Sequence, residues 1–567
     1  MRQQLLLSFL TIGSAITWAA GPVISDVVNY GSRIGSGLPG SGIAQGAVLA
    51  VTGAGLGPAQ ALQATFPLPT SDGLGGVTVT VTSGTSTANA IMVAVSATEV
   101  DAILPSSTPL GAATVTVSFG GATISKPITV VASAFGIFQG AGIYNVNADG
   151  SVSTNSTYQS AQPGQTIMIN GTGLGAIPSD ETQSGATDVP SATVAVWVGT
   201  QPATVVSSGR GSCCSGIDPN FRIPQGIAAW DVLTFTLPAG VTGCQVPIAV
   251  QSGGFVSNFI TISVATNGGT CPQAMQFNGG NPVFVSGPIK VGLVNMTRVV
   301  TNLNVGAAAV NNISDSATAI FTAADVGPNQ VPLPSYTNAL KSEVGTCTVF
   351  ASSFDRSVVL PTPPPSGQTP PPPLDAGPLL TITNAKFTQG MPNKNGVYSA
   401  TTVTSSIQIA PTPPIVSGGP DFIVPGPYGL SNGGGGADIG PFKATLSNPA
   451  AVKWESTAQN ATIDRSQGMT VKWSGGDPGG VLAITGFSTS TQGTVILVGS
   501  FYCYANISDG QFTVPSFITQ PMPASGTGPG SGSMTLDAIV ADLVTIPGVD
   551  VTYYFSQNSI GGPVVFQ

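Results

Sequence analysis

Two glycine-rich stretches have the residue types of a phosphate-binding turn. In VTGAGLG, Val51 to Gly57, alternate glycines follow an apolar run, and INGTGLG, Ile169 to Gly175, repeats the pattern. A phosphate site requires such a turn to open a helix, because the N-terminal amides of the helix bind the anion. Neither stretch is followed by a helix-forming segment or by a GK[ST] sequence. We therefore predict tight turns between strands and no cofactor.

The chain contains no histidine. This excludes Ser-His-Asp and Cys-His catalysis, histidine-ligated zinc and facial-triad iron sites. A Ser-Lys dyad or a pair of carboxylates remains available. The pair would act as in glycoside hydrolases, where two carboxyl groups lie about 5 to 10 Å apart. No sequence feature marks such a pair among the acidic residues, which include Asp180, Glu181, Asp188, Asp218, Asp231, Asp355, Asp464 and Asp477.

Two Asp-Arg sequences and one Asn-rich loop are explained more simply by local structure than by catalysis or calcium binding. We interpret FDRS, Phe354 to Ser357, and IDRS, Ile463 to Ser466, as local ion pairs or turn caps. NVNADGSVSTNS, Asn145 to Ser156, resembles a calcium loop, but its twelfth position is a serine, where calcium loops have a bidentate carboxylate. We predict a hairpin turn at its Asp-Gly pair.

Trp454 and Trp473, each in a VKW sequence, are the candidate ligand-facing aromatic residues. Flat aromatic rings can cover the apolar faces of sugars while neighbouring polar groups fix their orientation. Alternation along a strand would equally place these two side chains in the core, which is the interpretation we favour. The same two alternatives apply to Trp197 and Trp230.

The first twenty residues predict export. They contain one arginine, an apolar core from Leu5 to Ile16 and small residues before a cleavage point after Ala19. This is the pattern of a secretory signal peptide, residues 1–19, and the apolar core is short for a membrane span. No later apolar run reaches spanning length, so we predict a secreted or cell-surface protein without a transmembrane span. The net charge of −9 and the absence of a basic run argue against a nucleic-acid partner.

Export places the cysteines in an oxidising compartment, where their even number indicates three disulfides. The six are Cys213, Cys214, Cys244, Cys271, Cys347 and Cys503. Because adjacent cysteines rarely bond each other, we predict that Cys213 and Cys214 pair with Cys244 and Cys271 in some order. Cys347 is then left with Cys503. The CxxC spacing that would favour a metal site is absent.

The elements that position these residues are predicted to be strands. The 74 Gly and 47 Pro residues, with only 7% charged residues, favour strands and turns over helices. Period-two alternation marks half-buried strands in VTVTVT from Val77, ATVTVS from Ala113, TVAVWV from Thr193 and FITISV from Phe259. Since the glycine stretch also recurs at a domain-length interval, we predict two β-sandwich domains, 20–133 and 134–266.

Beyond Cys271 the repeat is lost. We predict a small β-rich segment at 267–359 and a proline-rich linker or loop at 360–378, where LPTPPPSGQTPPPPLDAGP favours polyproline II structure. Residues 379–567 return to strand character and predict a C-terminal β-sandwich. The predicted fold class is therefore all-β, with tandem immunoglobulin-like sandwiches followed by a further β-rich domain.

The same stretches carry a family resemblance. VTGAGLG and INGTGLG, each on a strand leading into a glycine-rich turn, look like the signature of IPT/TIG-type immunoglobulin-like domains. The order of PLPTSDGLGGVTVTV from Pro67, NADGSV from Asn147, GSCCSGID from Gly211 and LPAGVTGCQVPIAVQSGG from Leu237 resembles a large family of exported acidobacterial proteins of uncharacterised function. The resemblance covers about residues 23–271. It implies paired immunoglobulin-like units and export, and it carries no catalytic residues.

These features together predict a secreted, non-enzymatic protein that acts in binding, adhesion or surface structure. Its candidate partners are polysaccharides or components of the cell envelope. One alternative is a carbohydrate-binding module that assists secreted polysaccharide hydrolases, which predicts an exposed aromatic platform. The other is a glycoside hydrolase with a carboxylate pair, which predicts two acids converging in a cleft of the last domain.

Overall fold

The structure is a computed structural model that describes residues 21–211, 221–271, 287–305, 308–326, 343–358, 372–409, 414–419, 421–526, 528 and 530–567. Within these residues it consists of strands with one short helix, α1 (Ser516–Thr519), and one 3-10 turn, η2 (Ile507–Asp509). The predicted all-β class is therefore confirmed. The signal peptide at 1–19, Cys213, Cys214 and Asp218 lie outside the described residues.

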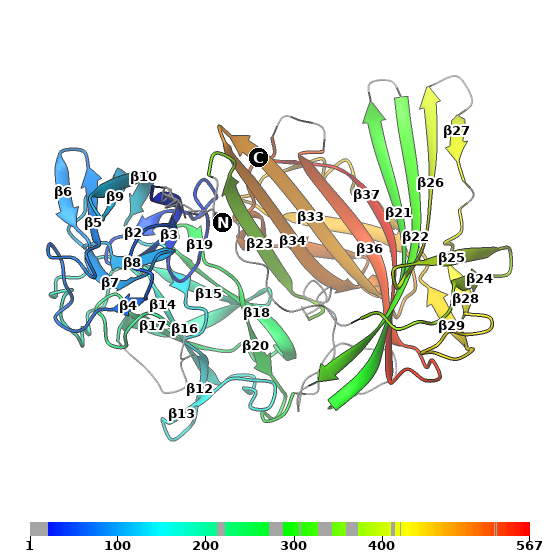
Figure 1. The fold of residues 1–567 in the computed structure, drawn as a ribbon, viewed down its shortest axis with the longest axis horizontal. Helices are drawn as coiled ribbons and strands as arrows, with labels where there is room; N and C mark the ends of the chain where they lie inside the picture. Colours follow the sequence, from blue (N-terminus) through cyan, green and yellow to red (C-terminus); the bar gives the residue numbers. More distant parts are fainter. Residues whose placement is uncertain are drawn as a thin grey trace, which may run out of the picture.

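Two five-stranded sheets form the N-terminal unit (Figure 1). Its strands are β1 (Val23–Asn29), β2 (Ile43–Ala44), β3 (Val48–Ala54), β4 (Leu62–Gln63), β5 (Thr78–Ser83), β6 (Ser86–Asn89), β7 (Ile91–Val95), β8 (Glu99–Ile103), β9 (Gly111–Phe119) and β10 (Ala122–Val131). The orders are β1-β3-β8-β7-β4 and β2-β10-β9-β5-β6. Alternate residues such as Val79 and Val81 of β5 enter a core shared by both sheets, so the unit is a sandwich.

The second unit is one ten-stranded sheet that folds over its own core. Its strands are β11 (Gly136–Ile137), β12 (Ile143–Val146), β13 (Val152–Thr154), β14 (Thr166–Thr172), β15 (Val194–Val198), β16 (Gln201–Arg210), β17 (Asp231–Thr236), β18 (Gly243–Ser252), β19 (Phe255–Val256) and β20 (Ile260–Val264). β16 pairs with β15 at its start and with β17 over the rest of its length, with a register shift between Val205 and Ser207. This strand therefore passes from one layer to the other.

The two units share a second apolar core at their junction. Tyr30 of the first unit packs edge-to-face on Phe138 and Phe221 of the second, with ring centroids 5.8 and 5.7 Å apart. Trp230 is fully buried beside them, and its indole N–H donates to Asn170 over 2.9 Å. Because the junction is apolar and aromatic, the two units form one continuous body.

The C-terminal part is built around a thirteen-stranded sheet. Its strands are β21 (Gly287–Val305), β22 (Ala308–Val326), β23 (Cys347–Asp355), β24 (Leu379–Thr383), β25 (Thr388–Lys394), β26 (Val397–Ile409), β27 (Ile415–Gly418), β28 (Gly426–Ser431), β29 (Lys443–Asn448), β33 (Val481–Gln492), β34 (Val495–Asn506), β36 (Gly532–Leu543) and β37 (Val551–Pro563). The order is β23-β34-β33-β36-β37-β21-β22-β26-β25-β24-β28-β29, with β27 paired to β26. β21, β22 and β26 extend upward at the right of Figure 1.

Two small sheets cover part of the inner face of this large sheet. They are β30 (Val452–Trp454), β32 (Met469–Gly475) and β35 (Gln511–Val514), and β31 (Thr462–Ile463) with β38 (Val565–Phe566). Leu482, Phe501 and Leu536 of the large sheet pack in one core with Val471 and Phe566 of the small sheets. Trp197 of the second unit stacks on Phe517 at 4.5 Å, which joins this core to the N-terminal units.

The large sheet joins residues from both sides of the proline-rich stretch. β21, β22 and β23 precede the stretch, yet they pair with β37, β26 and β34, which follow it. The predicted division into a small segment at 267–359, a linker at 360–378 and a separate sandwich at 379–567 does not hold for these strands. Alternation identifies a strand but leaves its pairing partner open, because many strands have compatible faces.

Two disulfides are described. Cys347 and Cys503 are directly opposite each other on β23 and β34, with Cα atoms 4.1 Å apart, which confirms that predicted pair. Cys244 bonds Cys271, so the predicted pairing of Cys213 and Cys214 with these two residues is wrong. The reason is topological: β20 runs antiparallel to β18, and the chain after β20 returns to the start of β18, where Cys244 lies.

Both glycine stretches end strands, and neither is followed by a helix in the described chain. Gly53 packs against the carbonyl of Val23 on the neighbouring strand, and Gly173 packs against the carbonyl of Ala134. A Cβ atom at either position would overlap that carbonyl, and Gly173 also has a φ of +112°. Gly53 and Gly173 therefore permit close backbone approach, a role that the predicted tight turns did not include, and Gly173 does so at the junction of the two units.

We expect Gly173→Ala to lower the free energy of unfolding by about 1 to 3 kcal/mol, because the new methyl group adds overlap to an unfavourable φ. Gly479→Ala is the matched control, since no atom lies within 4 Å of its added Cβ. Urea denaturation followed by circular dichroism measures both. Equal midpoints for the two variants would contradict the assigned role of Gly173.

Candidate functional site

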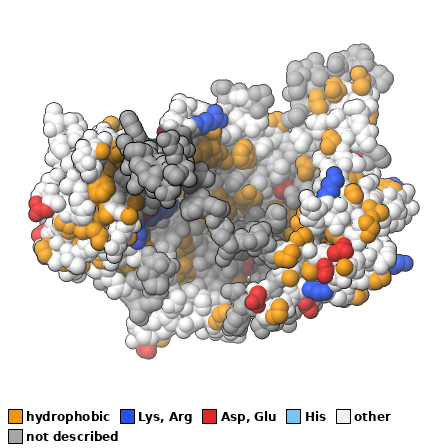
Figure 2. Space-filling model, in the orientation of Figure 1, with side chains coloured by type: hydrophobic (Ala, Val, Ile, Leu, Met, Phe, Trp, Pro, Cys, Tyr) orange, Lys and Arg blue, Asp and Glu red, His pale blue; other side chains and the backbone are white. Residues whose placement is uncertain are grey.

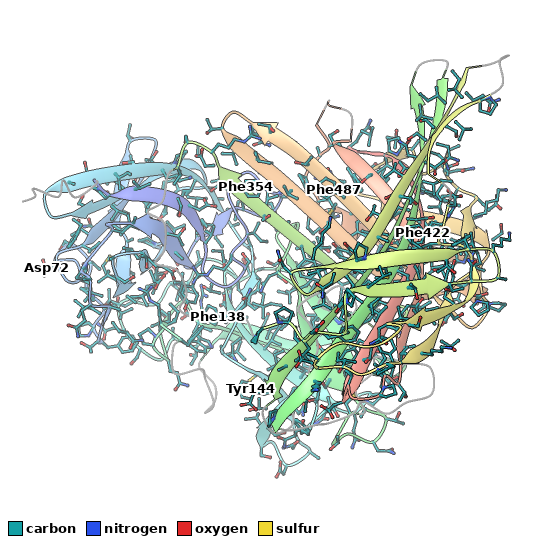
Figure 3. The ribbon with its side chains drawn as sticks, turned by 45° about the vertical axis from the view of Figure 1, so that its right-hand side comes forward. Asp72, Phe138, Tyr144, Phe354, Phe422 and Phe487 are labelled. Atoms are coloured by element: carbon teal, nitrogen blue, oxygen red, sulfur yellow. A yellow bond between two sulfur atoms is a disulfide. The ribbon has the colours of Figure 1, made fainter. Side chains whose placement is uncertain are left out.

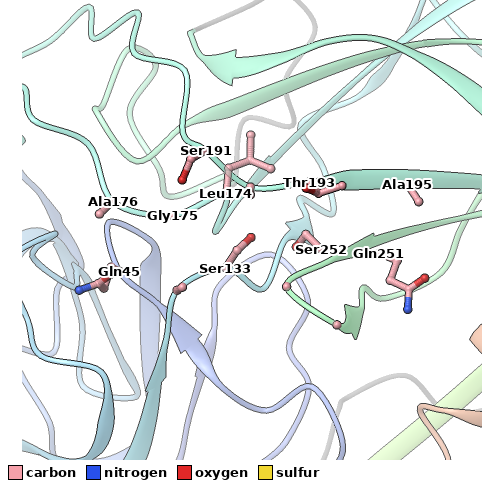
Figure 4. Close-up of a pocket in the computed structure, with 14 residues that line it drawn as sticks. Gln45, Ser133, Leu174, Gly175, Ala176, Ser191, Thr193, Ala195, Gln251 and Ser252 are labelled. Atoms are coloured by element: carbon pink, nitrogen blue, oxygen red, sulfur yellow. The ribbon is translucent and has the colours of Figure 1, made fainter. Parts of the chain in front are cut away.

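A cavity of about 550 Å³ opens where the two N-terminal units meet (Figure 4). Gln45 comes from the first unit, Ser133 from the connection, and Leu174 and Gly175 from the second glycine stretch. Two segments form the opposite wall: residues 191–193, before β15, and residues 251–254, at and after the end of β18. Figure 4 labels ten of the lining residues: Gln45, Ser133, Leu174, Gly175, Ala176, Ser191, Thr193, Ala195, Gln251 and Ser252.

A buried ion pair holds one wall of this cavity in place. Arg210 and Asp231 have fully buried side chains and bond each other. The Arg210 guanidinium also donates to the carbonyls of Gly46 and Gly175, one in each unit, and Asp231 accepts from the amide of Leu174 over 2.8 Å. Burial raises the pKa of Asp231 to about 6, and the nearby Arg210 opposes this rise. The pair therefore joins the segment before β3 in the first unit to the second glycine stretch.

The polar groups of the cavity wall are used for structure. The Ser133 hydroxyl donates to the carbonyl of Gly173, and the Ser252 hydroxyl accepts from the amide of Phe135. The Gln251 side chain donates to Gln520 of the C-terminal part over 3.1 Å. None of the described lining residues is charged. The cavity can hydrogen-bond a small neutral molecule, and its lining contains no acid-base pair.

Five of the acidic residues singled out in the sequence accept hydrogen bonds in turns or connections. Asp355 and Asp464 each accept from the amide and hydroxyl of the serine two residues later, which confirms the predicted turn caps. Asp180 caps a turn in the same way, Glu181 accepts from Ser106, and Asp477 accepts from the amide of Ala450. These carboxylates therefore stabilise turns and connections.

The predicted hairpin at the Asn-rich loop is also confirmed. β12 and β13 pair antiparallel across it. Asp149 accepts from the amide and the hydroxyl of Ser151 and so closes the turn. The Asn147 side chain donates to the same hydroxyl over 3.0 Å. These side chains hold the turn together through bonds to one another.

Trp454 and Trp473 are buried, with 6% and 4% of their surface exposed. They face each other across β30 and β32 and point into the core beneath the large sheet. The Trp473 N–H donates to the carbonyl of Ile507 over 2.8 Å, and the Trp454 N–H donates to Ser456 and Asn460. The structure therefore gives both residues the core position that alternation favours, and neither forms an exposed platform.

A second cavity, of about 450 Å³, is lined by residues between Glu455 and Lys472 and contains two carboxylates, Glu455 and Asp464. Hydrogen bonds from Ser474 and then Lys453 lower the pKa of Glu455, and bonds from Ser466 lower the pKa of Asp464. A glycoside hydrolase requires one carboxyl group with a raised pKa as its general acid. Both carboxyl groups of this cavity have lowered pKa values, which argues against the hydrolase alternative at this cavity.

Three exposed phenylalanines lie together on the outer face of β23, β34 and β33, whereas exposed Tyr158 lies in the second unit. Phe350 and Phe354 are each 51% exposed and Phe487 is 36% exposed. Tyr502 packs edge-to-face on Phe350 with centroids 6.0 Å apart. We call the three phenylalanines and Tyr502, with Ser352, Thr489, Ile496, Val498 and Ser500 between and beside them, the outer aromatic face.

Figure 3 labels Phe354 and Phe487 at the same end of the large sheet, and Figure 2 shows hydrophobic side chains gathered over this region. The face exists because alternate residues of each strand point away from the core: Val349 and Phe501 are buried, whereas Phe350 and Ser500 point outward. The sequence signal was the spacing of Phe350 and Phe354, four residues apart on one strand. The sequence prediction named only tryptophans as ligand-facing aromatic residues and so missed these phenylalanines.

A buried carboxylate lies next to this face, on the neighbouring strand β36. Asp537 of β36 is 5% exposed and accepts from the hydroxyls of Thr535 and Thr485, at 3.1 and 3.4 Å. Burial raises the pKa of Asp537 above its ordinary value, although these hydrogen bonds oppose the rise. The folded chain therefore binds a proton at Asp537 at a higher pH than the unfolded chain does.

We expect the free energy of unfolding to rise as the pH falls from 7 toward about 4, because a raised folded pKa means that the folded state takes up the proton first. Asp537→Asn should weaken this dependence, since it removes one of the titrating groups. Urea denaturation at pH 7, 6 and 5 measures the slope. Asp72→Asn, at an exposed position, serves as the control, and identical slopes for the two variants would exclude a contribution from Asp537.

No helix of the described residues is long and apolar enough to cross a membrane.

Comparisons with known proteins found no matching protein family and no matching curated protein. Among solved structures, a titin fragment is similar at 10% identity over 69% of this chain and 92% of that chain, with a TM-score of 0.13. Invasin, a bacterial integrin-binding protein, covers 91% of this chain and 75% of its own at 10% identity and a TM-score of 0.12. The insect immune protein hemolin is similar at 10% identity over 95% of this chain and 100% of its own, with a TM-score of 0.12. Similarity at this level assigns no function, and the fold class rests on the sheets described above.

Proposed function

We propose that the chain is an exported, non-enzymatic binding protein that acts in adhesion or surface structure at the cell envelope. Its N-terminal units, 20–133 and 134–266, would be paired IPT/TIG-type immunoglobulin-like domains of the exported acidobacterial family that the sequence resembles. Two disulfides support an oxidising compartment. The Cys213–Cys214 sequence would belong to the same framework.

The observation that carries the binding function is the outer aromatic face. A soluble monomer gains nothing in stability from leaving Phe350, Phe354 and Phe487 in water, since burial of an aromatic ring is favourable by about 1.5 to 3 kcal/mol. Exposed aromatic residues that gather on one face are typical of binding surfaces. The core stacking of Trp197 on Phe517 joins this sheet to the paired units, so they would act as a support that presents the face.

Retention of the purified mature chain on envelopes of its own host tests this function. We expect the wild type to be depleted from solution and the double variant Phe350→Ala/Phe354→Ala to remain largely unbound. Leu110→Ala is the control, because Leu110 is 56% exposed on the first unit, away from the face. Equal retention of the wild type and the double variant would contradict a role of the face in binding.

A further inference from the structure

We infer that the outer aromatic face binds a neutral polysaccharide chain. This inference rests on the proposed binding function and specifies the ligand class of the same surface. Three features of the face support it: the arrangement of its rings, the absence of charge among its described residues, and its small apolar area.

The aromatic rings are spaced along and across the strands, with hydroxyl groups between them. Cross-strand pairing places Phe350, Ser500 and Phe487 in one row. Phe354 lies four residues further along β23, with exposed Ser352 between it and Phe350. Strand spacing and rise place the backbone of Phe350 about 10 Å from that of Phe487 and about 13 Å from that of Phe354. Phe354, Phe350 and Tyr502 therefore form a row of contact points along the direction of β23, and Phe487 lies to one side of this row.

This arrangement matches the chemistry of a sugar polymer. A pyranose ring presents a face of C–H groups, which packs on an aromatic ring, and hydroxyl groups around its edge. Hydroxyl side chains such as Ser352, Ser500 and Thr489 can donate to and accept from those hydroxyls. A linear polysaccharide repeats both features along its length, so it can contact several rings of the face at once.

The lack of charged side chains among the rings favours neutral sugars over acidic ones. The outward residues within the three strands around the rings are uncharged: Thr348, Phe350, Ser352, Phe354, Thr485, Phe487, Thr489, Thr491, Ile496, Val498, Ser500 and Tyr502. One cation, the exposed Arg356, follows directly after the end of β23. An acidic polysaccharide would need basic partners to compensate for the desolvation of its carboxylates or sulfates. The chain as a whole has a net charge of −9, which also disfavours a polyanion.

The exposed apolar area fits a thin ligand better than a second folded protein. Two half-exposed phenylalanines and a third that is 36% exposed present an apolar area on the order of 300 Å². A stable protein interface buries about 800 Å² on each partner, with a hydrophobic centre. A single polysaccharide chain needs only a narrow strip, which is the form that the row of rings takes.

The test uses the full mature chain with four insoluble neutral polysaccharides, cellulose, chitin, mannan and starch, and with insoluble polygalacturonate as the acidic probe. We expect depletion by at least one neutral polysaccharide. Phe350→Ala/Phe354→Ala should weaken that binding at least about tenfold, and Phe487→Ala, on a different strand, should weaken it as well. Leu110→Ala should bind like the wild type. Matching circular dichroism spectra and melting temperatures show that the variants are folded.

The other outcomes separate this inference from the proposed function. Retention on host envelopes that depends on Phe350 and Phe354, without binding to any neutral polysaccharide, would overturn the sugar ligand and leave the binding function standing. Binding to polygalacturonate alone would also overturn the inference. Neutral-sugar binding that is unchanged in both phenylalanine variants would place the site elsewhere and refute the assignment. Retention on neither envelopes nor polysaccharides would refute both.

Discussion

Arg210→Met is expected to lower the free energy of unfolding by about 3 to 5 kcal/mol, because it leaves the buried carboxylate of Asp231 without its cation. The guanidinium also donates to the carbonyls of Gly46 and Gly175, so the segment before β3 and the second glycine stretch each lose a hydrogen-bond donor. Urea denaturation at pH 7, followed by circular dichroism and by tryptophan fluorescence, measures the loss. Trp230 directly precedes Asp231 in the sequence and is fully buried, so it is expected to report on this junction.

The double variant Arg210→Met/Asp231→Asn distinguishes an unpaired charge from a simple packing defect. The asparagine oxygen can still accept from the amide of Leu174, while the buried charge is gone, so most of the lost stability should return. Lowering the pH toward 5 should also reduce the defect of the single variant, since Asp231 then becomes protonated in the folded state. A double variant that is no more stable than Arg210→Met would rule out this explanation.

Removal of the Cys347–Cys503 disulfide should cost up to about 5 kcal/mol, because the bond closes a loop across a sequence separation of 156 residues. The Cys244–Cys271 bond spans only 27 residues, for which the same chain-entropy relation gives about 3.5 kcal/mol. We therefore expect Cys347→Ala/Cys503→Ala to be less stable than Cys244→Ala/Cys271→Ala. Unfolding in urea under non-reducing conditions compares the two pairs with the wild type.

Dithiothreitol provides the control for both disulfide variants. Reduction should destabilise the wild type by more than it destabilises either variant, because each variant has one bond fewer to lose. If the variant without the shorter loop were the less stable of the two, loop length would not be the dominant factor, and native packing around Cys244 would have to explain the difference.

The secondary structure could be predicted from the sequence wherever alternation was regular. VTVTVT and ATVTVS become β5 and β9, whose valines enter the core while the threonines point outward. The Asp-Gly hairpin and the two serine-capped aspartates also follow from local chemistry, because each depends on residues only a few positions apart. Local rules therefore account for most individual elements.

The pairing of distant strands could not be predicted in the same way. The parallel contact of β21 with β37 brings Val291 beside Val551, and no local pattern in either strand specifies the other. The Cys244–Cys271 bond was missed for the same reason, since it depends on the return of the chain after β20. The outer aromatic face likewise required the pairing of β23 with β34, which places Phe350 beside Ser500.

The parallel contact of β21 with β37 has a consequence for the order in which the chain folds. In the described part of the chain the first ten strands pair only among themselves, so the N-terminal sandwich can close as soon as its own residues have been synthesised. β21 must wait for β37, which is among the last residues to be made. Until then the apolar face of its long hairpin with β22 is uncovered. Slow, non-local closure of this kind leaves the edges of the β21–β22 hairpin unpaired until β37 has been synthesised.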